Sequence, residues 1–310
     1  MPLGFEEQRS ERGVVWLRSS MAEALRAAGV SSDDRRTFDV ADVGGRVPLR
    51  TVAAGGQTVL IRDFTHGGLA GRALGLFPGM VRAYLDPRRP FVELGLMERL
   101  AAVGIPVPTA AFARAQRGPI GWRLQLGTVR LGGDADLTRD LGDWLGRLRR
   151  GEVAPRAAQR LARAAGRLVA RLHEVGFHHA DLQPANLLVV GDPAQALPTV
   201  FALDLDGSRF LPDLASGARH RNLARLWRHV RRREERYGAS LSRADRARFL
   251  RAWAAHTRRG AKPAGARTVW REAWRAIDVL ETRGRWLHRL GWAVGRLIGA
   301  PPDLRARPKV

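Results

Sequence analysis

The stretch around residues 176–206 is the part of the sequence that most constrains the fold. An apolar helical segment stops at Gly176, and the polar loop His179–Asn186 follows it. Two short apolar runs, Leu187–Val190 and Val200–Leu203, come next, and Asp204 follows the second run. Short apolar runs joined by a Gly-Asp-Pro turn predict a buried pair of strands. The chain therefore delivers a second acidic residue on the far side of a strand pair that begins at the loop.

The residue types in this loop suit the transfer of a phosphoryl group. Such a transfer needs an acceptor hydroxyl held in line and a metal ion that bridges the phosphates. Asp181 would orient the hydroxyl and accept its proton, with His179 in a supporting role. Asn186 and Asp204 offer the hard oxygen atoms that Mg²⁺ prefers. Asp206 is the alternative to Asp204, and its distance from the strand makes Asp204 the better candidate.

A glycine-containing turn and two charged residues point to a phosphate-binding region earlier in the chain. Gly44 and Gly45 lie between short β-like segments, where a turn without Cβ atoms allows backbone N–H groups to approach a phosphate. An ordinary hairpin turn explains the same two glycines equally well. Arg62 ends a predicted strand, and Glu93 lies in a segment with helical periodicity. The two residues could pair, but spacing alone favours Glu93 as a solvated carboxylate on a helix face.

The order of predicted elements indicates an α+β protein with two lobes. Residues 1–36 form an N-terminal arm, in which Val14–Val30 are expected to be a short helix or irregular. Residues 37–131 form a small β-rich N-lobe with one helix, and residues 132–310 form a larger, mostly helical C-lobe. The C-lobe would carry the catalytic loop, the metal site and C-terminal helices rich in Arg and Trp.

The charge and composition narrow the classes of partner. The chain has 53 Lys and Arg residues against 30 Asp and Glu residues, a formal net charge of +23, so its surface attracts anions. It has no cysteine, which excludes disulfides and thiolate metal sites. Met1–Ser20 lack an apolar signal core, and no apolar run reaches the ~18 residues that span a bilayer. These features indicate a cytoplasmic protein that touches a membrane surface; nucleic acid is a less favoured partner because no readout motif accompanies the charge.

The sequence resembles the lipopolysaccharide kinases, in particular those that phosphorylate 3-deoxy-D-manno-octulosonic acid (Kdo), within the protein-kinase-like superfamily. The resemblance covers roughly residues 38–232. Its motifs are Val59–Arg62 with His66–Leu69, Arg89–Glu93, Gly104–Pro108, His179–Asn186 and Asn222–Leu226.

The resemblance implies a bilobal protein-kinase-like fold that uses ATP and Mg²⁺. It implies that Asp181 is the catalytic base, that Asn186 and Asp204 are metal ligands, and that Glu93 is an ion-pair partner. The implied acceptor is Kdo in a lipid A precursor at the cytoplasmic face of the inner membrane of a Gram-negative bacterium. Arg62 stands where the superfamily has a nucleotide-contacting lysine, and it reaches and packs differently.

Three other interpretations remain open. The chain could be a kinase for another core sugar such as heptose, or for another small molecule, although a kinase for cationic drugs would be expected to have an acidic pocket. It could also be a catalytically silent pseudokinase that binds a membrane or nucleic acid. Asp181, Asn186 and Asp204 argue against silence, and Arg62 argues for it. Among the C-terminal helices, Arg285–Ala300 is the best amphipathic candidate for contact with an anionic inner-membrane surface.

Overall fold

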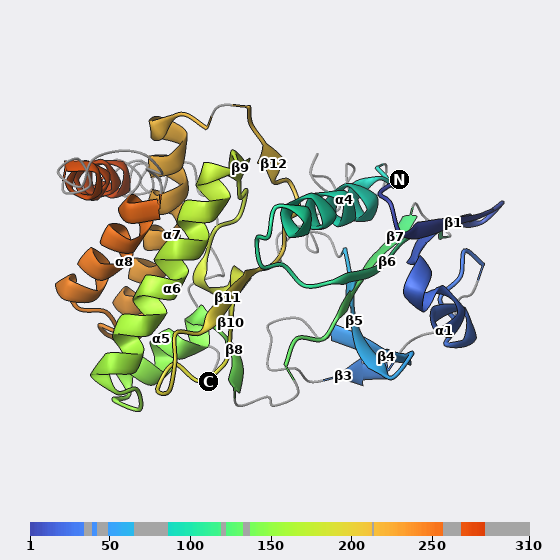
Figure 1. The fold of residues 1–310 in the computed structure, drawn as a ribbon, viewed down its shortest axis with the longest axis horizontal. Coiled ribbons are helices and arrows are strands. Elements are labelled where there is room, and N and C mark those ends of the chain that lie inside the picture. The colour runs from blue at the N-terminus through green and yellow to red at the C-terminus, as the bar shows by residue number, and fades with distance from the viewer. Residues whose placement is uncertain are drawn as a thin grey trace, which may run out of the picture.

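The computed structural model describes residues 1–33, 39–41, 49–64, 86–118, 122–132, 137–212, 214–256 and 268–282 of the chain. Within them a β-sheet with a helix on each face lies beside a mostly helical part, and these two parts are called the N-lobe and the C-lobe (Figure 1). The α+β, two-lobed architecture expected from the sequence is confirmed.

The N-lobe is built on a seven-stranded sheet in which all neighbouring strands run antiparallel. The strand order is β1-β2-β6-β7-β5-β4-β3. The strands are β1 (Phe5–Ser10), β2 (Gly13–Arg18), β3 (Asp39–Ala41), β4 (Leu49–Ala54), β5 (Gln57–Asp63), β6 (Ala110–Arg117) and β7 (Trp122–Val129). Strands β4 and β5 form a hairpin, and its turn places Gly55 and Gly56 at positive φ.

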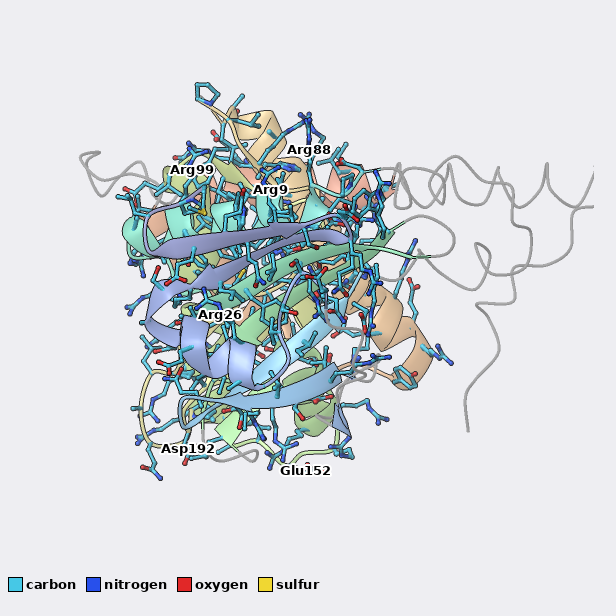
Figure 2. All side chains as sticks on the ribbon, turned by 90° about the vertical axis from the view of Figure 1, so that its right-hand side faces the viewer. Arg9, Arg26, Arg88, Arg99, Glu152 and Asp192 are labelled. Carbon is cyan, nitrogen blue, oxygen red and sulfur yellow. The ribbon has the colours of Figure 1, made fainter. Side chains whose placement is uncertain are left out.

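Two helices cover opposite faces of this sheet. The 3-10 turn η1 (Ser19–Met21) leads into α1 (Ala22–Ala27), which lies over one face (Figure 2), where Leu25 packs with Leu17, Ile61 and Phe112. Helix α4 (Arg89–Ala102) covers the other face with Leu94, Met97 and Leu100. The hydrophobic cluster around α4 continues into the C-lobe. This helix therefore connects the cores of the two lobes.

The N-terminal segment belongs to the sheet and is not a separate arm. Strand β2 pairs with β1 on one side and with β6 on the other, so the expected helix or irregular structure at the start of Val14–Val30 is wrong. Val15 and Leu17 are buried, while Trp16 between them faces the opposite side, which is the period-2 pattern of a strand. Pairing with β6 determines the conformation of this segment, which is too short for its local sequence to predict a strand.

The C-lobe contains a three-stranded sheet, a two-stranded sheet and several packed helices. Its elements are β8 (Thr138–Asp140), α5 (Leu141–Arg149), α6 (Pro155–Glu174), β9 (Phe177–His178), the 3-10 turn η3 (Pro184–Asn186), β10 (Leu187–Val190), β11 (Thr199–Ala202), β12 (Arg209–Phe210), α7 (Ser216–Tyr237), α8 (Arg243–His256) and a helix at 268–282. Helix α5 begins at Leu141, where Asp140 caps it by accepting a hydrogen bond from the Asp143 N–H at 2.9 Å.

The connection from α6 to β11 positions the loop that holds the candidate residues. Gly176 ends α6 with φ +75°, and a Cβ there would lie 2.3 Å from the Leu211 carbonyl oxygen. The predicted strand pair is confirmed as antiparallel β10 and β11, with Leu187 opposite Ala202. Just past this pair the Leu203 N–H donates to the Asn186 carbonyl oxygen at 2.9 Å. The backbone thereby places Asn186 next to the residue before Asp204.

Candidate active site

Asp181 lies in the loop between β9 and η3, and both of its carboxylate oxygens are engaged. Oδ1 accepts hydrogen bonds from Nε and Nη2 of Arg225 at 3.1 and 2.6 Å, and Oδ2 accepts one from the side-chain amide of Gln183. Burial alone would raise the pKa of Asp181, but the hydrogen bonds and charge of Arg225 outweigh it and lower the pKa below its usual range. Asp181 is therefore ionised at neutral pH.

His179 fixes the loop to the end of β11. It is fully buried, its Nδ1 accepts from the Asp181 N–H at 3.2 Å, and its Nε2 donates to the Leu203 carbonyl oxygen at 3.0 Å. Burial lowers the pKa of His179, so the ring is neutral. These contacts agree with the supporting role expected for His179.

A chain of buried hydrogen bonds holds the same loop from behind. The Asn222 amide on α7 donates to the His179 carbonyl oxygen at 2.7 Å, and its oxygen accepts from His173 Nε2 on α6 at 3.1 Å. His173 Nδ1 in turn accepts from Trp253 Nε1 on α8 at 3.0 Å. Because the indole can only donate, the direction of every bond in this chain is fixed. Burial lowers the pKa of His173 to about 3, which keeps the ring neutral.

Arg62 joins the two lobes through two carboxylates. Its guanidinium pairs with Glu93 on α4 through one terminal nitrogen and with Asp204 through the other. Glu93 is only 3% exposed, so its interpretation as a solvated carboxylate is wrong, and the pairing with Arg62 is what the structure shows. Glu93 also accepts a hydrogen bond from the Leu205 N–H at 3.0 Å. Burial raises the pKa of Glu93 to about 7, although the charge of Arg62 acts in the opposite direction.

Asp206 has a different partner from Asp204. Arg89 in the first turn of α4 contacts both carboxylate oxygens of Asp206, through Nε and Nη2. The ring of Phe64 lies close to both arginines, with its centroid 4.6 Å from Cζ of Arg62 and 5.3 Å from Cζ of Arg89. The segment that contains Asp204 and Asp206 is thus held from the N-lobe by two cations that share one aromatic ring.

Asn186 and Asp204 carry the oxygen atoms that could hold a magnesium ion. Asn186 uses its amide nitrogen to donate to the Asp181 carbonyl oxygen at 2.8 Å, and its side-chain oxygen makes no hydrogen bond within the described residues. Asp204 has φ +55° and a side chain that is 41% exposed. The Asn186 amide oxygen and the Asp204 carboxylate, whose Oδ1 also contacts Arg62, are oxygen donors of the kind that could hold Mg²⁺. Gly44 and Gly45 lie outside the described residues.

Sequence reasoning singled out Asp181, Asn186, Asp204, Arg62 and Glu93 but missed the partners that hold them. Arg225 and Gln183 contact Asp181, and Arg89 contacts Asp206. Arg225 did carry a signal, since it stands in the stretch Asn222–Leu226 that contributes to the family resemblance. Arg89 stands in another such stretch, Arg89–Glu93. The local sequence does not reveal the role of either arginine, because its carboxylate partner is distant in the sequence.

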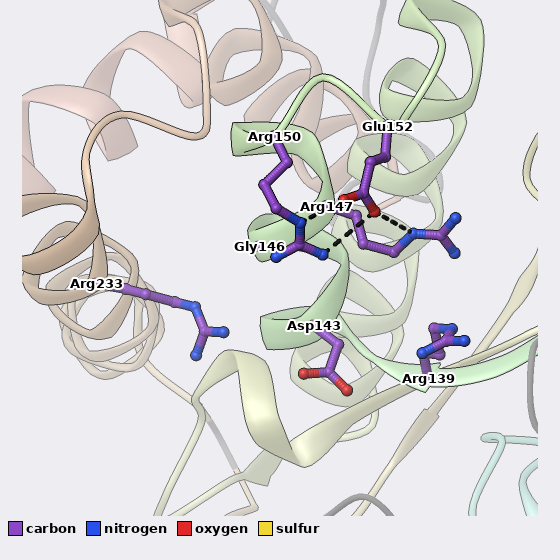
Figure 3. A pocket seen from close by; sticks show the side chains of 7 residues that line it. All are labelled: Arg139, Asp143, Gly146, Arg147, Arg150, Glu152 and Arg233. Atoms are coloured by element: carbon purple, nitrogen blue, oxygen red, sulfur yellow. Dashed lines mark hydrogen bonds and ion pairs between the residues drawn. The ribbon is translucent and has the colours of Figure 1, made fainter. Parts of the chain in front are cut away.

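A polar hollow lies beside α5. Its lining consists of Arg139, Asp143, Gly146, Arg147, Arg150, Glu152 and Arg233 (Figure 3). Glu152 accepts hydrogen bonds from both Arg147 and Arg150, so two of the cations around this hollow are already paired. None of the candidate catalytic or metal-binding residues lines it.

Known proteins share this sequence pattern and this fold. Residues 42–253 match the family model described as the lipopolysaccharide kinase (Kdo/WaaP) family. A 3-deoxy-D-manno-octulosonic acid kinase of Xanthomonas campestris pv. campestris (strain B100) is 31% identical over 240 residues, which cover 73% of this chain and 83% of the relative. A kinase of the same name from Stenotrophomonas maltophilia (strain K279a) is 32% identical over 215 residues, or 68% of this chain and 76% of the relative.

A solved structure described as WaaP in complex with acyl carrier protein has the same fold. The match has a TM-score of 0.53 at 20% sequence identity and covers 86% of this chain and 91% of that one. At this identity the likeness is evidence for the fold alone. It confirms the bilobal protein-kinase-like fold that the sequence predicts.

Proposed function

Because the chain belongs to the lipopolysaccharide kinase (Kdo/WaaP) family, we propose that it transfers the γ-phosphoryl group of ATP to a hydroxyl of Kdo in a lipid A or inner-core lipopolysaccharide precursor. The chain is a phosphotransferase by its family. The relatives that carry the name Kdo kinase support the choice of acceptor.

The site residues divide the work of such a transfer. Asp181, ionised and facing the loop, would accept a hydrogen bond from the acceptor hydroxyl and take its proton as the oxygen attacks phosphorus. Asn186 and Asp204 would hold Mg²⁺, which when bound neutralises charge on the phosphate oxygens. Arg62, held by Glu93, would place its guanidinium on the phosphates. Arg62 would then do with a planar fork what a lysine does as a point charge.

The observation that carries this proposal is the meeting of three groups at one end of the β10–β11 pair. Asn186 donates to the Asp181 backbone, Leu203 binds back to Asn186, and Asp204 contacts the Arg62–Glu93 pair. A candidate base, two candidate oxygen ligands and a half-buried arginine with its two carboxylates therefore converge from both lobes. That convergence argues against a silent basic binding protein.

The direct test uses purified protein, labelled ATP, Mg²⁺ and a Kdo-containing lipid A precursor. Asp181→Ala should reduce transfer by at least ~10²-fold, since it removes the proton acceptor. Asp192→Ala is the matched control, because Asp192 lies in the turn between β10 and β11 on the outer surface, where Figure 2 labels it. Undiminished transfer by Asp181→Ala would exclude Asp181 from the reaction, and transfer to a heptose acceptor instead of Kdo would reassign the substrate.

A place at the cytoplasmic face of the inner membrane is part of the proposal. Among the described residues, no helix has the length and hydropathy to cross a bilayer. The net charge of +23 would attract a peripheral protein to anionic lipid, and the acceptor is itself lipid-anchored. Arg285–Ala300 lies outside the described residues. Replacing Arg283, Arg285, Arg289 and Arg296 together should weaken binding to anionic liposomes in a salt-dependent way, and unchanged binding would remove this segment from the proposal.

A further inference from the structure

The guanidinium of Arg225 occupies the oxygen that an acceptor hydroxyl would need. Two of its nitrogens contact Oδ1 of Asp181, and Gln183 contacts Oδ2. A hydroxyl that approaches Asp181 must therefore share or replace one of these donors. Gln183 is a neighbour on the same loop, whereas Arg225 reaches in from α7. The arginine is the contact that can be exchanged without moving the loop.

The exposure of this ion pair makes the exchange inexpensive. The side chain of Arg225 is 43% exposed and that of Asp181 is 33% exposed. An ion pair with this much contact with water contributes little to stability. Arg62 differs, since it is held between Glu93, which is 3% exposed, and Asp204. Arg225 is thus a permanent cation on the accessible side of Asp181 with a weakly held partner.

The face of α7 around Arg225 is suited to an anion. Arg221 and His229 lie one turn before and one turn after it, so the three residues share one face of the helix. Burial lowers the pKa of His178, and the charge of Arg221 contributes to this lowering. Burial lowers the pKa of His229, although the charge of Asp181 raises it in part. Arg225 contacts the carboxylate of Asp181. A neutral sugar has no carboxylate that could take the place of Asp181 at this arginine.

We propose that Arg225 recognises the acceptor's own carboxylate and thereby makes the enzyme specific for a sugar acid. This inference rests on the proposed function, whose acceptor is an acid by name. The acceptor carboxylate would take the two guanidinium nitrogens that now contact Asp181, a pairing for which the planar fork of arginine is suited. Oδ1 of Asp181 would then be free to accept the hydrogen bond of the hydroxyl. A neutral sugar offers no carboxylate and would leave Asp181 paired with Arg225.

The proposal predicts a coupling between one side chain and one substrate group. Transfer is measured with the Kdo-containing lipid A precursor and with an analogue in which the carboxylate is replaced by a carboxamide. The wild-type protein should prefer the carboxylate acceptor by ~10²-fold in kcat/KM, because the analogue leaves Arg225 without its new partner. Arg225→Gln should lose about that factor on the carboxylate acceptor and less than ~3-fold on the carboxamide. KM for ATP should not change.

Two further variants separate recognition from structure. Arg225→Lys keeps the charge and should recover part of the preference, since a lysine pairs with a carboxylate but without the bidentate geometry. Arg167→Gln is the matched control: Arg167 is exposed on α6, and the same charge change there should leave the preference intact. A loss of activity on both acceptors by the same factor in Arg225→Gln would overturn the proposal, because it would mean that Arg225 only orients Asp181.

Equilibrium binding distinguishes this inference from the proposed function. Titration calorimetry with the two acceptors needs no transfer. Tighter binding of the carboxylate acceptor to wild type, with that preference lost in Arg225→Gln, supports the role of Arg225 even if no phosphoryl transfer to Kdo is seen. Equal binding of the two acceptors to wild type overturns it, even if transfer to Kdo proceeds.

Discussion

Arg89 holds Asp206 with two nitrogens and thereby ties the first turn of α4 to the segment that follows β11. The same segment begins with Asp204, which contacts Arg62 of β5. Two arginines of the N-lobe therefore form ion pairs with two carboxylates of the C-lobe that are two positions apart in the sequence. We therefore expect the position of Asp204 to depend on both ion pairs.

Breaking the Arg89–Asp206 pair should weaken the use of ATP. Arg89→Gln removes one of the two anchors of the segment, and kcat/KM for ATP is expected to fall about 10-fold. Asp206→Asn should have the same effect, and the double variant should be no worse than either single one. Arg88→Gln provides the control, since Arg88 is the exposed neighbour that Figure 2 labels. Additive losses in the double variant would show that the two residues act separately.

Lysine should not substitute fully for Arg62. A lysine is a single point charge, whereas Arg62 pairs with Glu93 and Asp204 through two different nitrogens. Arg62→Lys is expected to lower kcat/KM for ATP by about 10-fold and Arg62→Gln by about 10²-fold. Arg130→Gln, at an exposed position just after β7, should leave kcat/KM for ATP unchanged. Full activity in Arg62→Lys would mean that the use of ATP does not require the two separate nitrogens of the guanidinium.

The pH–rate profile should report Glu93. The pKa of Glu93 is raised to about 7, so the carboxylate that pairs with Arg62 is lost as the pH falls through that value. The pKa of Asp181 is lowered, so Asp181 stays ionised throughout this range. We therefore expect kcat/KM for ATP to decrease below a pH of about 7. In Glu93→Gln the constant should be lower and independent of pH here, and a limb near 7 that survives in this variant would assign it to another group.

His173 should make stability decrease in acid. The pKa of His173 is about 3 in the folded protein against 6.5 as its ordinary value, so the unfolded chain binds more protons between these two values. Stability is then greatest above 6.5 and falls with decreasing pH, by up to about 1.4 kcal/mol per pH unit from this residue. Urea unfolding at several pH values measures the slope. His173→Gln should reduce it, whereas His256→Gln at the end of α8 should not.

Two glycines on helices should respond to alanine in opposite directions. A Cβ at Gly166 on α6 would lie 2.4 Å from the Phe249 carbonyl oxygen of α8, so Gly166→Ala is expected to destabilise the protein by about 1–3 kcal/mol. A Cβ at Gly95 on α4 would meet no atom within 4 Å, and Gly95→Ala should stabilise it by up to about 1 kcal/mol. Urea midpoints compare the two variants, and a stable Gly166→Ala would show that α6 and α8 can separate.

Local patterns in the sequence were sufficient to predict the strand pair that follows the loop. The loop, the strand pair and the spacing of Asp181, Asn186 and Asp204 are written within 24 consecutive residues, and the structure retains that layout. Arg89 and Arg225 could not be assigned in the same way. Their partners lie 117 and 44 positions away, and a chain with 53 basic residues offers many equivalent candidates.

Two other differences have equally specific causes. The burial of Glu93 depends on α4 packing under the sheet and against the C-lobe, which helical periodicity does not reveal. The conformation of residues 13–18 depends on β6, which lies about a hundred positions later in the chain. In both cases a long-range contact determines which of the structures compatible with the local sequence is formed.

The pairing of β2 with β6 also determines where the chain can be shortened. A protein that starts at residue 42 would contain every candidate site residue, because none of them lies in the first 41 positions. It would, however, leave β6 at the edge of the sheet. Its freed N–H and C=O groups would form a template for strands of other molecules, and Phe112 and Ile61 would lose the cover of Val15 and Leu17. We therefore expect the first 18 residues to protect the edge of β6 from self-association, and a shortened protein should be recovered as aggregates or exchanged dimers.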